Sequence, residues 1–454
     1  MNLDITRKTL IIKKDIRSFI WIQLYIVAVF GFFRDIIGIP GSFYYTVDLL
    51  NLFVFVYALL KRIYVKQNTK LYYFIMAIVI IFFLFTIAGY IAGDYSILLY
   101  LWGLRNNYRF YIAFFSCAVF FKFEDVLKLR KFFTNLLYLN VIASTFEFTM
   151  GYTGDYLGGT FGIIQGVNGY TNILMIIVTS FTVVEYLSKK SSFIKLSMVI
   201  TSCLYLAIIT ELKFYIFELV FIIIIAMFSE RISIRKIVLI AFVFIGIVIG
   251  IIAIGSLFPV FKNFFTFDEI SKYIGDNGYT GKGDFNRLNA VRKVKEIFFK
   301  NDIMRIILGF GLGNCSFSSF DILTSEFYNL YNALHYQWFT DSFIFVETGT
   351  IGLLLYEFFY IVIFIASMVI SHSVKYKSNQ YIILKAVGII SICCIICSIY
   401  DVSLQMEASY YIFIILSAIL IIDKQNYKEK SMEKENDKNK RRFKRISREG
   451  EGCL

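Results

Sequence analysis

The segment from Gly309 to Gly352 combines glycine turns, a short polar and aromatic stretch and the start of a long apolar run. It reads GFGLGN at 309–314 and LHYQWFTDSFIFVETGTIG at 334–352. It contains His335, one of two histidines in the chain, and two acids, Asp341 and Glu347, at the start of the apolar run. Titratable groups at the mouth of such a run indicate a membrane helix that begins beside a polar site.

The composition around this segment is that of a membrane protein. Hydrophobic residues make up 58% of the 454 residues, charged residues 17%, and the mean hydropathy is +0.68. A soluble protein of this size could not bury that much apolar surface. The apolar runs are continuous, whereas the strands of a membrane β-barrel alternate. The chain has only two prolines, so few helices are broken. We therefore predict an all-α, polytopic integral membrane protein.

The apolar runs and the basic clusters together predict about twelve transmembrane helices. Basic residues follow every second run, as expected for cytoplasmic loops. This alternation places both termini in the cytoplasm and one large loop, about 259–340, outside it. The predicted spans are 18–33, 43–60, 71–92, 107–121, 132–150, 168–187, 193–210, 214–228, 237–258, 341–370, 381–399 and 409–422.

The chain divides into a membrane domain, 1–422, which includes the large loop, and a charged tail, 423–454. The tail mixes Lys, Arg, Asp and Glu without an apolar period, so we predict disorder at the cytoplasmic face, with contact to anionic lipid as an alternative. The basic N-terminus lacks a small-residue cleavage site, which predicts a retained signal-anchor. The net charge of +13 is explained by the cytoplasmic loops, and nucleic acid is not an expected partner.

The sequence predicts no metal site and no cofactor. Cys393, Cys394 and Cys397 lie within one apolar run without a fourth ligand nearby, so they are interpreted as packing residues. The second histidine, His372, is predicted on the opposite side of the membrane from His335. The segment GFGLGN lacks the strand and helix context of a nucleotide fingerprint and is interpreted as a turn.

Three cations on the predicted outer side are candidates for binding an anionic group. Lys213 stands in TELKFYIFEL (210–219) between two apolar spans, against the charge trend of outer loops. An ionisable residue there requires a partner or a function; a structural pair with Glu211 or Glu218 is the alternative. Arg105 and Arg109 raise the same question at the fourth span. Arginine binds phosphate oxygens in a bidentate manner, and lysine binds them as a point charge.

The large loop adds a further group of cations in RLNAVRKVKEIFFK (287–300). Leu288, Val291, Val294 and Ile297 or Phe298 recur at helical spacing, which predicts an amphipathic helix. Arg292 belongs to its polar face, where lipid headgroups or solvent are the alternative to a site. Arg287 directly follows the glycine-rich stretch 275–286 and is the stronger candidate for ligand binding.

His335 has two interpretations. It is an ordinary hydrogen-bonded histidine at the membrane interface, or it is a general base, because its pKa lies near working pH. Asp341 and Glu347 are candidates for orienting it or for acting as the base in its place.

Four segments resemble the O-antigen polymerase and O-antigen ligase superfamily of bacterial polysaccharide assembly, whose layout of about twelve spans with one large outer loop is also similar. GGTFGIIQGVNGYTNIL (158–174) resembles the family's Gly-x-Phe…Asn segment, with Asn168 as the asparagine. TELKFYIFEL, GFGLGN, and His335 followed by VETGTIG (346–352) resemble three later motifs. Lys213 stands where the family usually has arginine, which keeps the charge but loses the bidentate fork.

The resemblance implies an enzyme that polymerises undecaprenyl diphosphate-linked oligosaccharide repeat units by inverting glycosyl transfer at the outer face of the plasma membrane. It implies that Lys213 and Arg287 hold the diphosphate and that His335 acts in catalysis. Donor and acceptor glycans, membrane lipid, a chain-length regulator and a flippase are the implied partners.

Three other functions compete with this expectation. A ligase that moves a finished glycan to a lipid or protein acceptor would share the same site residues. A flippase or other transporter is disfavoured by the long outer loop and by the lack of an internal repeat. A scaffold without activity would leave His335 and the outer cations without a role.

Overall fold

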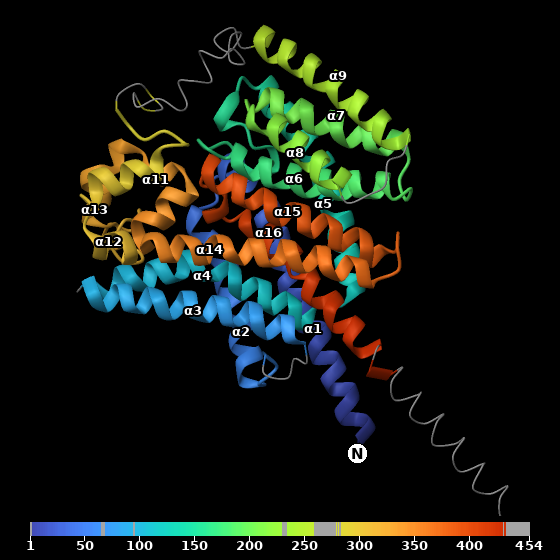
Figure 1. The fold of residues 1–454 in the computed structure, drawn as a ribbon, viewed down its shortest axis with the longest axis horizontal. Helices are drawn as coiled ribbons and strands as arrows, with labels where there is room; N and C mark the ends of the chain where they lie inside the picture. The colour runs from blue at the N-terminus through green and yellow to red at the C-terminus, as the bar shows by residue number, and fades with distance from the viewer. Residues whose placement is uncertain are drawn as a thin grey trace, which may run out of the picture.

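The structure is a computed structural model in which every regular element of the described residues is helical (Figure 1). It describes residues 2–64, 69–93, 96–228, 234–257, 278, 280, 283–429 and 431–432. Half of the glycine-rich stretch 275–286 and most of the tail lie outside these residues. The start of the tail, which was predicted to be disordered from residue 423, is helical, because the helical structure that begins at 418 continues to 429.

The long helices of the bundle coincide closely with the predicted apolar spans. The predicted fourth and fifth spans are too short at their starts, since their helices begin ten and nine residues earlier, at Ile97 and Phe123. The helices are α1 (Asn2–Phe32), α2 (Tyr45–Leu60), α3 (Lys70–Gly93), α4 (Ile97–Phe120), α5 (Phe123–Thr149), α6 (Asn168–Leu187), α7 (Phe193–Ile209), α8 (Phe214–Phe228), α9 (Ile234–Leu257), α14 (Thr340–Ser373), α15 (Asn379–Tyr400) and α16 (Ser409–Leu416).

Six helices of the described chain are long and apolar enough to cross a membrane. They cover Ile16–Ile37, Gly41–Leu60, Lys70–Gly93, Asn168–Leu187, Thr340–Ser373 and Asn379–Tyr400. Two more apolar helices, Phe193–Ile209 and Phe214–Phe228, are shorter than a full span. The prediction of an α-helical membrane protein is confirmed.

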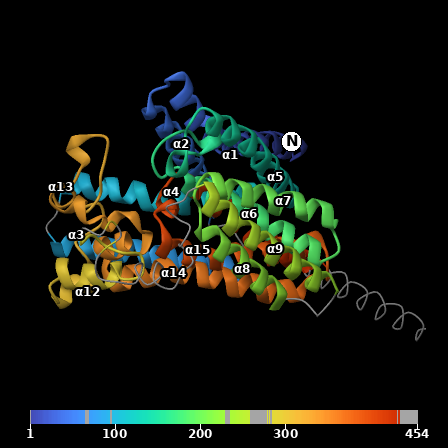
Figure 2. The same cartoon turned by 90° about the horizontal axis from the view of Figure 1, so that it is seen from above.

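Helix α6 is the centre of the bundle. All but the first of its residues are buried, and it contacts α5, α7, α8 and α15 (Figure 2). Helix α15 lies between α6 and α14, and most of its residues are also buried. Because both helices are apolar on all sides, they fit an interior position rather than a surface one.

The described part of the large loop folds into a small helical cap. It contains α11 (Ala290–Lys293), α12 (Ile303–Leu308), α13 (Glu326–Tyr331) and single turns between them. Figure 1 shows these helices gathered at one end of α14, and α12 also contacts α3. Phe285, Phe298, Tyr336 and Phe345 contribute to a second apolar core, which joins the cap to the start of α14.

The predicted amphipathic helix in this cap is partly wrong. The helix starts at Ala290, so Leu288 precedes it and is exposed. The predicted Val294 and Phe298 are buried, and Ala290 completes the buried face at a spacing of four residues. A turn of π-helix over Val294–Phe298 keeps Phe298 on that face.

Two close backbone contacts fix the cap against the bundle. Gly313 in the GFGLGN turn has φ +85°, and its backbone packs against that of Gly103 in α4, leaving no room for a Cβ on either residue. Gly349 kinks α14 with φ +64°, and a Cβ there would collide with the carbonyl of Ile307 in α12. These positions require glycine for both conformation and space.

Candidate functional site

Lys213 lies in a tight turn between α7 and α8. Glu211 adopts φ +56°, which reverses the chain after α7 ends at Ile209. Helix α8 begins at Phe214, so the Lys213 side chain projects from the joint of two buried helices and is only 8% exposed. Burial and the positive charge of Arg287 lower the pKa of Lys213, Glu211 and Asp155 partly oppose both effects, and the resulting pKa is about 8.

Arg287 reaches the end of α15 from the large loop. Its Nε donates a hydrogen bond of 3.0 Å to the carbonyl oxygen of Tyr400, and its guanidinium carbon lies 4.2 Å from the centre of the Tyr400 ring. The same ring stacks on Phe214, with centroids 3.9 Å apart and planes 5° apart. Tyr400 therefore links the residue that follows Lys213 to Arg287, and the two predicted cations lie in one site.

Asn168 lies at the same place, at the first turn of α6. Its Nδ2 donates to Oδ1 of Asp155 at 2.8 Å and to the carbonyl of Thr210 at 3.2 Å. The second bond ties the start of α6 to the turn that carries Lys213. Asn168 thus holds two segments of the site in position.

His335 belongs to the loop side of the site. It adopts φ +58° between two single turns, and its ring stacks on Trp338 at 3.7 Å. The carbonyl of the preceding Leu334 accepts a hydrogen bond of 3.0 Å from the N–H of Phe285, two residues before Arg287. Burial lowers the pKa of His335 below its ordinary value, although the negative charge of Asp284 opposes this. The imidazole is therefore neutral at pH 7.

Glu347 makes a different set of contacts. Its side chain is fully buried, and Oε1 accepts hydrogen bonds from Ser316 Oγ at 2.7 Å and from the N–H of Cys315 at 3.3 Å. These bonds hold the segment after the GFGLGN turn on α14, which favours a positioning role. Asp341 lies in the first turn of α14, where its Oδ1 accepts from the N–H of Ser342. An acid at a helix N-terminus is stabilised by the helix dipole.

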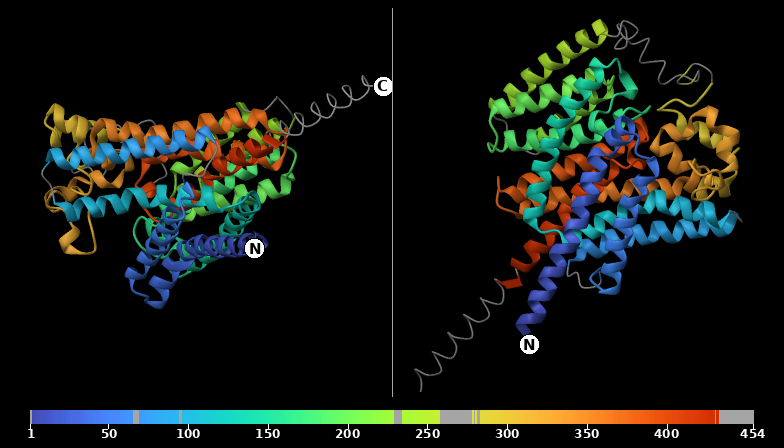
Figure 3. Two further views of the ribbon diagram at one scale, coloured as in Figure 1. Left: turned by 90° about the horizontal axis from the view of Figure 1, so that it is seen from below. Right: turned by 180° about the vertical axis from the view of Figure 1, so that it is seen from behind.

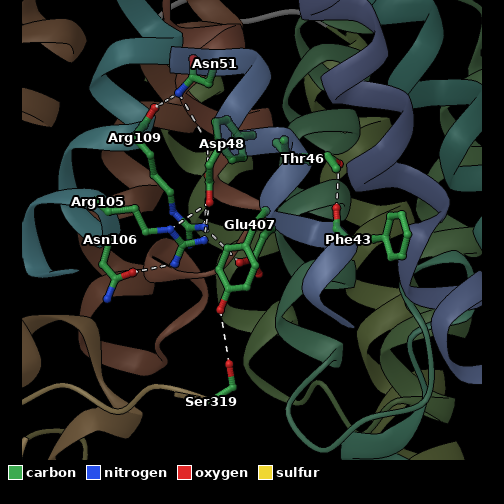
Figure 4. A network of polar contacts seen from close by, with 12 residues as sticks. Phe43, Thr46, Asp48, Asn51, Arg105, Asn106, Arg109, Ser319 and Glu407 are labelled. Atoms are coloured by element: carbon green, nitrogen blue, oxygen red, sulfur yellow. Dashed lines mark hydrogen bonds and ion pairs between the residues drawn. The ribbon is translucent and has the colours of Figure 1, made fainter. Parts of the chain in front are cut away.

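Arg105 and Arg109 form a second polar network, which Figure 4 shows in close view. Arg105 pairs with Asp48 of α2, and Arg109 pairs with Glu407 at 3.0 Å and with Asp48 at 3.6 Å. Tyr410 donates a hydrogen bond of 2.6 Å to Asp48. Each arginine already faces a carboxylate, so the network is nearly balanced in charge and fits helix association better than binding of an external anion.

The two polar regions meet at the start of α6. Tyr170, two residues after Asn168, donates a hydrogen bond to Glu407. Burial raises the pKa of Glu407, but the Arg109 charge and the Tyr170 hydroxyl outweigh this, so the net shift is downward. Glu407 is therefore ionised at neutral pH. Arg292 lies apart from this region of contacts: half of its side chain is exposed and it pairs with Glu296 on its own helical turn.

The site combines two cations with a neutral imidazole, which is carried by a loop segment that is hydrogen-bonded two residues before Arg287. Within the described ranges, no group of three or more His, Cys, Asp and Glu side chains could hold a metal ion. Lys213 and Arg287 supply donors for a multiply charged anion, and His335 supplies a proton acceptor.

No protein-family model matches the chain, and no curated protein matches it either. The resemblance noted in the sequence therefore stays a hypothesis, which the geometry of the site has to support.

Sequence reasoning missed the residues contributed by the far end of the chain. Tyr400 is the last residue of α15 and Asp401 follows it. The backbone carbonyl of Asp401 accepts hydrogen bonds from the N–H and hydroxyl of Thr340, which fixes the start of α14. Glu407 was not identified from the sequence either. Polar residues interrupting two apolar runs were a visible signal, but their partners lie far away in the sequence.

Proposed function

We propose that the protein polymerises undecaprenyl diphosphate-linked oligosaccharide repeat units into a surface polysaccharide. The reaction is an inverting glycosyl transfer between two lipid-linked glycans. The reaction takes place at the outer face of the plasma membrane. In this proposal the chain crosses the membrane about twelve times and has both termini in the cytoplasm.

The observation that carries this proposal is the approach of Lys213 to Arg287. Each cation lowers the stability of the other's charged form, and burial adds to that cost. Such an arrangement is favourable when an anion with several oxygens lies between the two charges. A diphosphate on a membrane-embedded lipid meets that requirement at the mouth of the helical bundle.

The proposed roles divide binding from proton transfer. Lys213 and Arg287 hold the donor diphosphate and stabilise the charge that develops as it leaves. A hydroxyl of the acceptor glycan forms a bond to the anomeric carbon of the donor, and the bond from that carbon to the phosphate oxygen breaks. His335 accepts the hydroxyl proton, and undecaprenyl diphosphate departs.

The other candidates take supporting roles in this proposal. Asn168 positions the turn of Lys213, and Glu347 positions the loop after the glycine turn. Arg105 and Arg109 are left out of the diphosphate site because Asp48 and Glu407 already neutralise them. A flippase that delivers the donor and a chain-length regulator are the expected partners.

Loss of the protein distinguishes this activity from that of a ligase. Deletion of a polymerase leaves single repeat units attached to the final acceptor, whereas deletion of a ligase leaves polymer on the lipid carrier. Gel analysis of surface glycan and of extracted carrier lipid measures both products. Carrier-linked polymer in the deletion strain would reject polymerisation in favour of ligation.

A further inference from the structure

A groove lies between α1 and α5, on a part of the bundle away from the residues assigned to transfer. Its volume is about 560 Å³. Figure 3 shows α1 crossing the molecule from behind, with its N-terminal part projecting beyond the bundle. The groove is lined by Trp21, Tyr25, Ala28, Val29, Lys128, Lys131, Phe132, Asn135, Leu136 and Leu139.

The groove is polar at one end and apolar along the rest. On α5, the exposed residues Lys128, Lys131, Asn135 and Leu139 follow one another at helical spacing, so they form one stripe. The two lysines stand at its beginning and Leu139 at its end. This order matches a ligand with an anionic head and an apolar chain.

The helices run side by side in the same direction here. Arg17 of α1 pairs with Asp125 at the start of α5, with Nη1 and Oδ2 3.0 Å apart. Farther along, Trp21 and Tyr25 both contact the ring of Phe132, with centroids 6.1 Å and 5.3 Å apart. Arg17 therefore lies beside the charged start of α5, and the aromatic wall of the groove begins next to this pair.

The two groove lysines differ from the other cations at this end. Arg17 is paired with Asp125, and Arg130 is paired with Glu185 at 2.6 Å. Among the described residues, no carboxylate pairs with Lys128 or Lys131. The buried carboxylates of Asp125 and Glu185 thus pair with the neighbouring arginines, and the ammonium groups of Lys128 and Lys131 remain available at the mouth of the groove.

The length of the stripe fits one leaflet of a bilayer. From Lys128 to Leu139 the helix rises about 16 Å at 1.5 Å per residue, close to half of the roughly 30 Å hydrocarbon core. Tyr25 and Leu139 are about half exposed, so the apolar part of the groove opens sideways toward lipid.

We propose that this groove binds an anionic glycerophospholipid. The phosphate lies between Lys128 and Lys131, and one acyl chain follows Trp21, Tyr25 and Leu139. Basic residues between membrane helices recognise anionic headgroups in this way. The site is separate from glycan transfer and does not depend on that proposed function.

Tryptophan fluorescence in nanodiscs tests the site. Replacing Trp102 and Trp338 with Phe leaves Trp21 as the only tryptophan in the full chain. Phosphatidylglycerol with brominated acyl chains is then titrated into phosphatidylcholine discs, and brominated phosphatidylcholine serves as the neutral probe. We expect the anionic lipid to quench Trp21 at a lower mole fraction than the neutral lipid.

Charge and shape variants make the test specific. Lys128→Gln with Lys131→Gln should weaken the preference for phosphatidylglycerol about 30-fold, at about fivefold for each lysine. Leu139→Phe should reduce quenching by filling the apolar part. The matched control, Lys61→Gln with Lys190→Gln, removes two exposed cations elsewhere and should keep the preference.

Three results would overturn the proposal. Equal quenching by both lipids would mean non-selective contact with the surrounding bilayer. An unchanged preference in the Lys128 and Lys131 variant would place the anionic lipid elsewhere. Stronger displacement of the brominated lipid by undecaprenyl phosphate than by unlabelled phosphatidylglycerol would assign the groove to the carrier lipid instead.

Discussion

The guanidinium of Arg287 lies against Tyr400, with a hydrogen bond of 3.0 Å to the tyrosine carbonyl and 4.2 Å from its carbon to the ring centre. A residue of the large loop is thereby fixed on the end of a buried helix. Its charge also acts on Lys213, which directly precedes Phe214, the residue whose ring stacks on Tyr400. This contact is the basis of the first two predictions.

Arg287→Ala should abolish polymer formation while the protein still accumulates in the membrane. Loss of one charge-assisted contact, at roughly 1.5–3 kcal/mol, corresponds to a loss of about 10- to 150-fold. The measurement is chain extension by purified protein with lipid-linked repeat units. Arg292→Ala is the matched control, since that side chain is exposed and pairs within its own turn. Normal polymer from Arg287→Ala would remove this residue from the diphosphate site.

Lys213 gives the site a dependence on pH. With a pKa of about 8, its ammonium group is charged below that pH and neutral above it. Donor binding should therefore be complete at pH 7 and decline as the pH rises through 8. Lys213→Arg should bind the donor and keep binding at pH 9, because the guanidinium stays charged. Lys213→Ala should bind weakly at every pH, and a wild-type profile from this variant would contradict the assignment.

His335→Ala should nearly stop transfer and leave donor binding intact. A general base contributes roughly 10²- to 10⁴-fold, whereas binding is assigned to the cations. Because burial lowers the pKa of His335, wild-type activity should be complete at pH 7 and fall only on acidification below the ordinary histidine range. Donor binding and chain extension are measured separately. If donor binding is lost as fully as in Arg287→Ala, His335 belongs to the diphosphate site; extension at the wild-type rate would make it an interfacial residue.

Glu347 should respond to substitution as a positioning residue. Glu347→Ala leaves the Ser316 hydroxyl and the Cys315 N–H without their acceptor, at a cost of about 1–3 kcal/mol, and should lower thermal stability and activity together. Glu347→Gln retains an acceptor oxygen and should preserve most of both. Melting curves and chain-extension rates, measured on the same preparations, distinguish a positioning role from proton transfer. Full stability with lost activity in Glu347→Gln would instead identify Glu347 as a proton-transferring group.

The proposed topology is tested by labelling. A cysteine in place of the exposed Ile322, in the helical cap, should react with an impermeant thiol reagent in intact cells, because the proposed topology places the cap outside the cytoplasm. Cys453→Ser removes the thiol of the tail from the background. A cysteine at Lys190, also exposed, should react only after lysis. The opposite pattern would reverse the orientation and exclude a site for lipid-linked glycans on the outer face.

The sequence by itself determined the fold class and the positions of the long helices. Apolar runs of sufficient length specify helices in a membrane, since the backbone can satisfy its hydrogen bonds there only within the segment. That is why the start of α6 at Asn168 and both ends of α8 were read directly from the residues. The sequence also singled out Lys213, because charge at the edge of an apolar span is costly, and Arg287, because it directly follows a glycine-rich stretch.

Only the tertiary structure decided which of the charged residues stand together. Asp48 and Glu407 come from opposite ends of the chain, and their pairing with Arg105 and Arg109 depends on how α2, α4 and the segment before α16 pack. Periodicity describes one helix at a time and carries no information on such contacts. The same limit applies to Tyr400 beside Arg287 and to the groove between α1 and α5, both of which arise where segments distant in sequence meet.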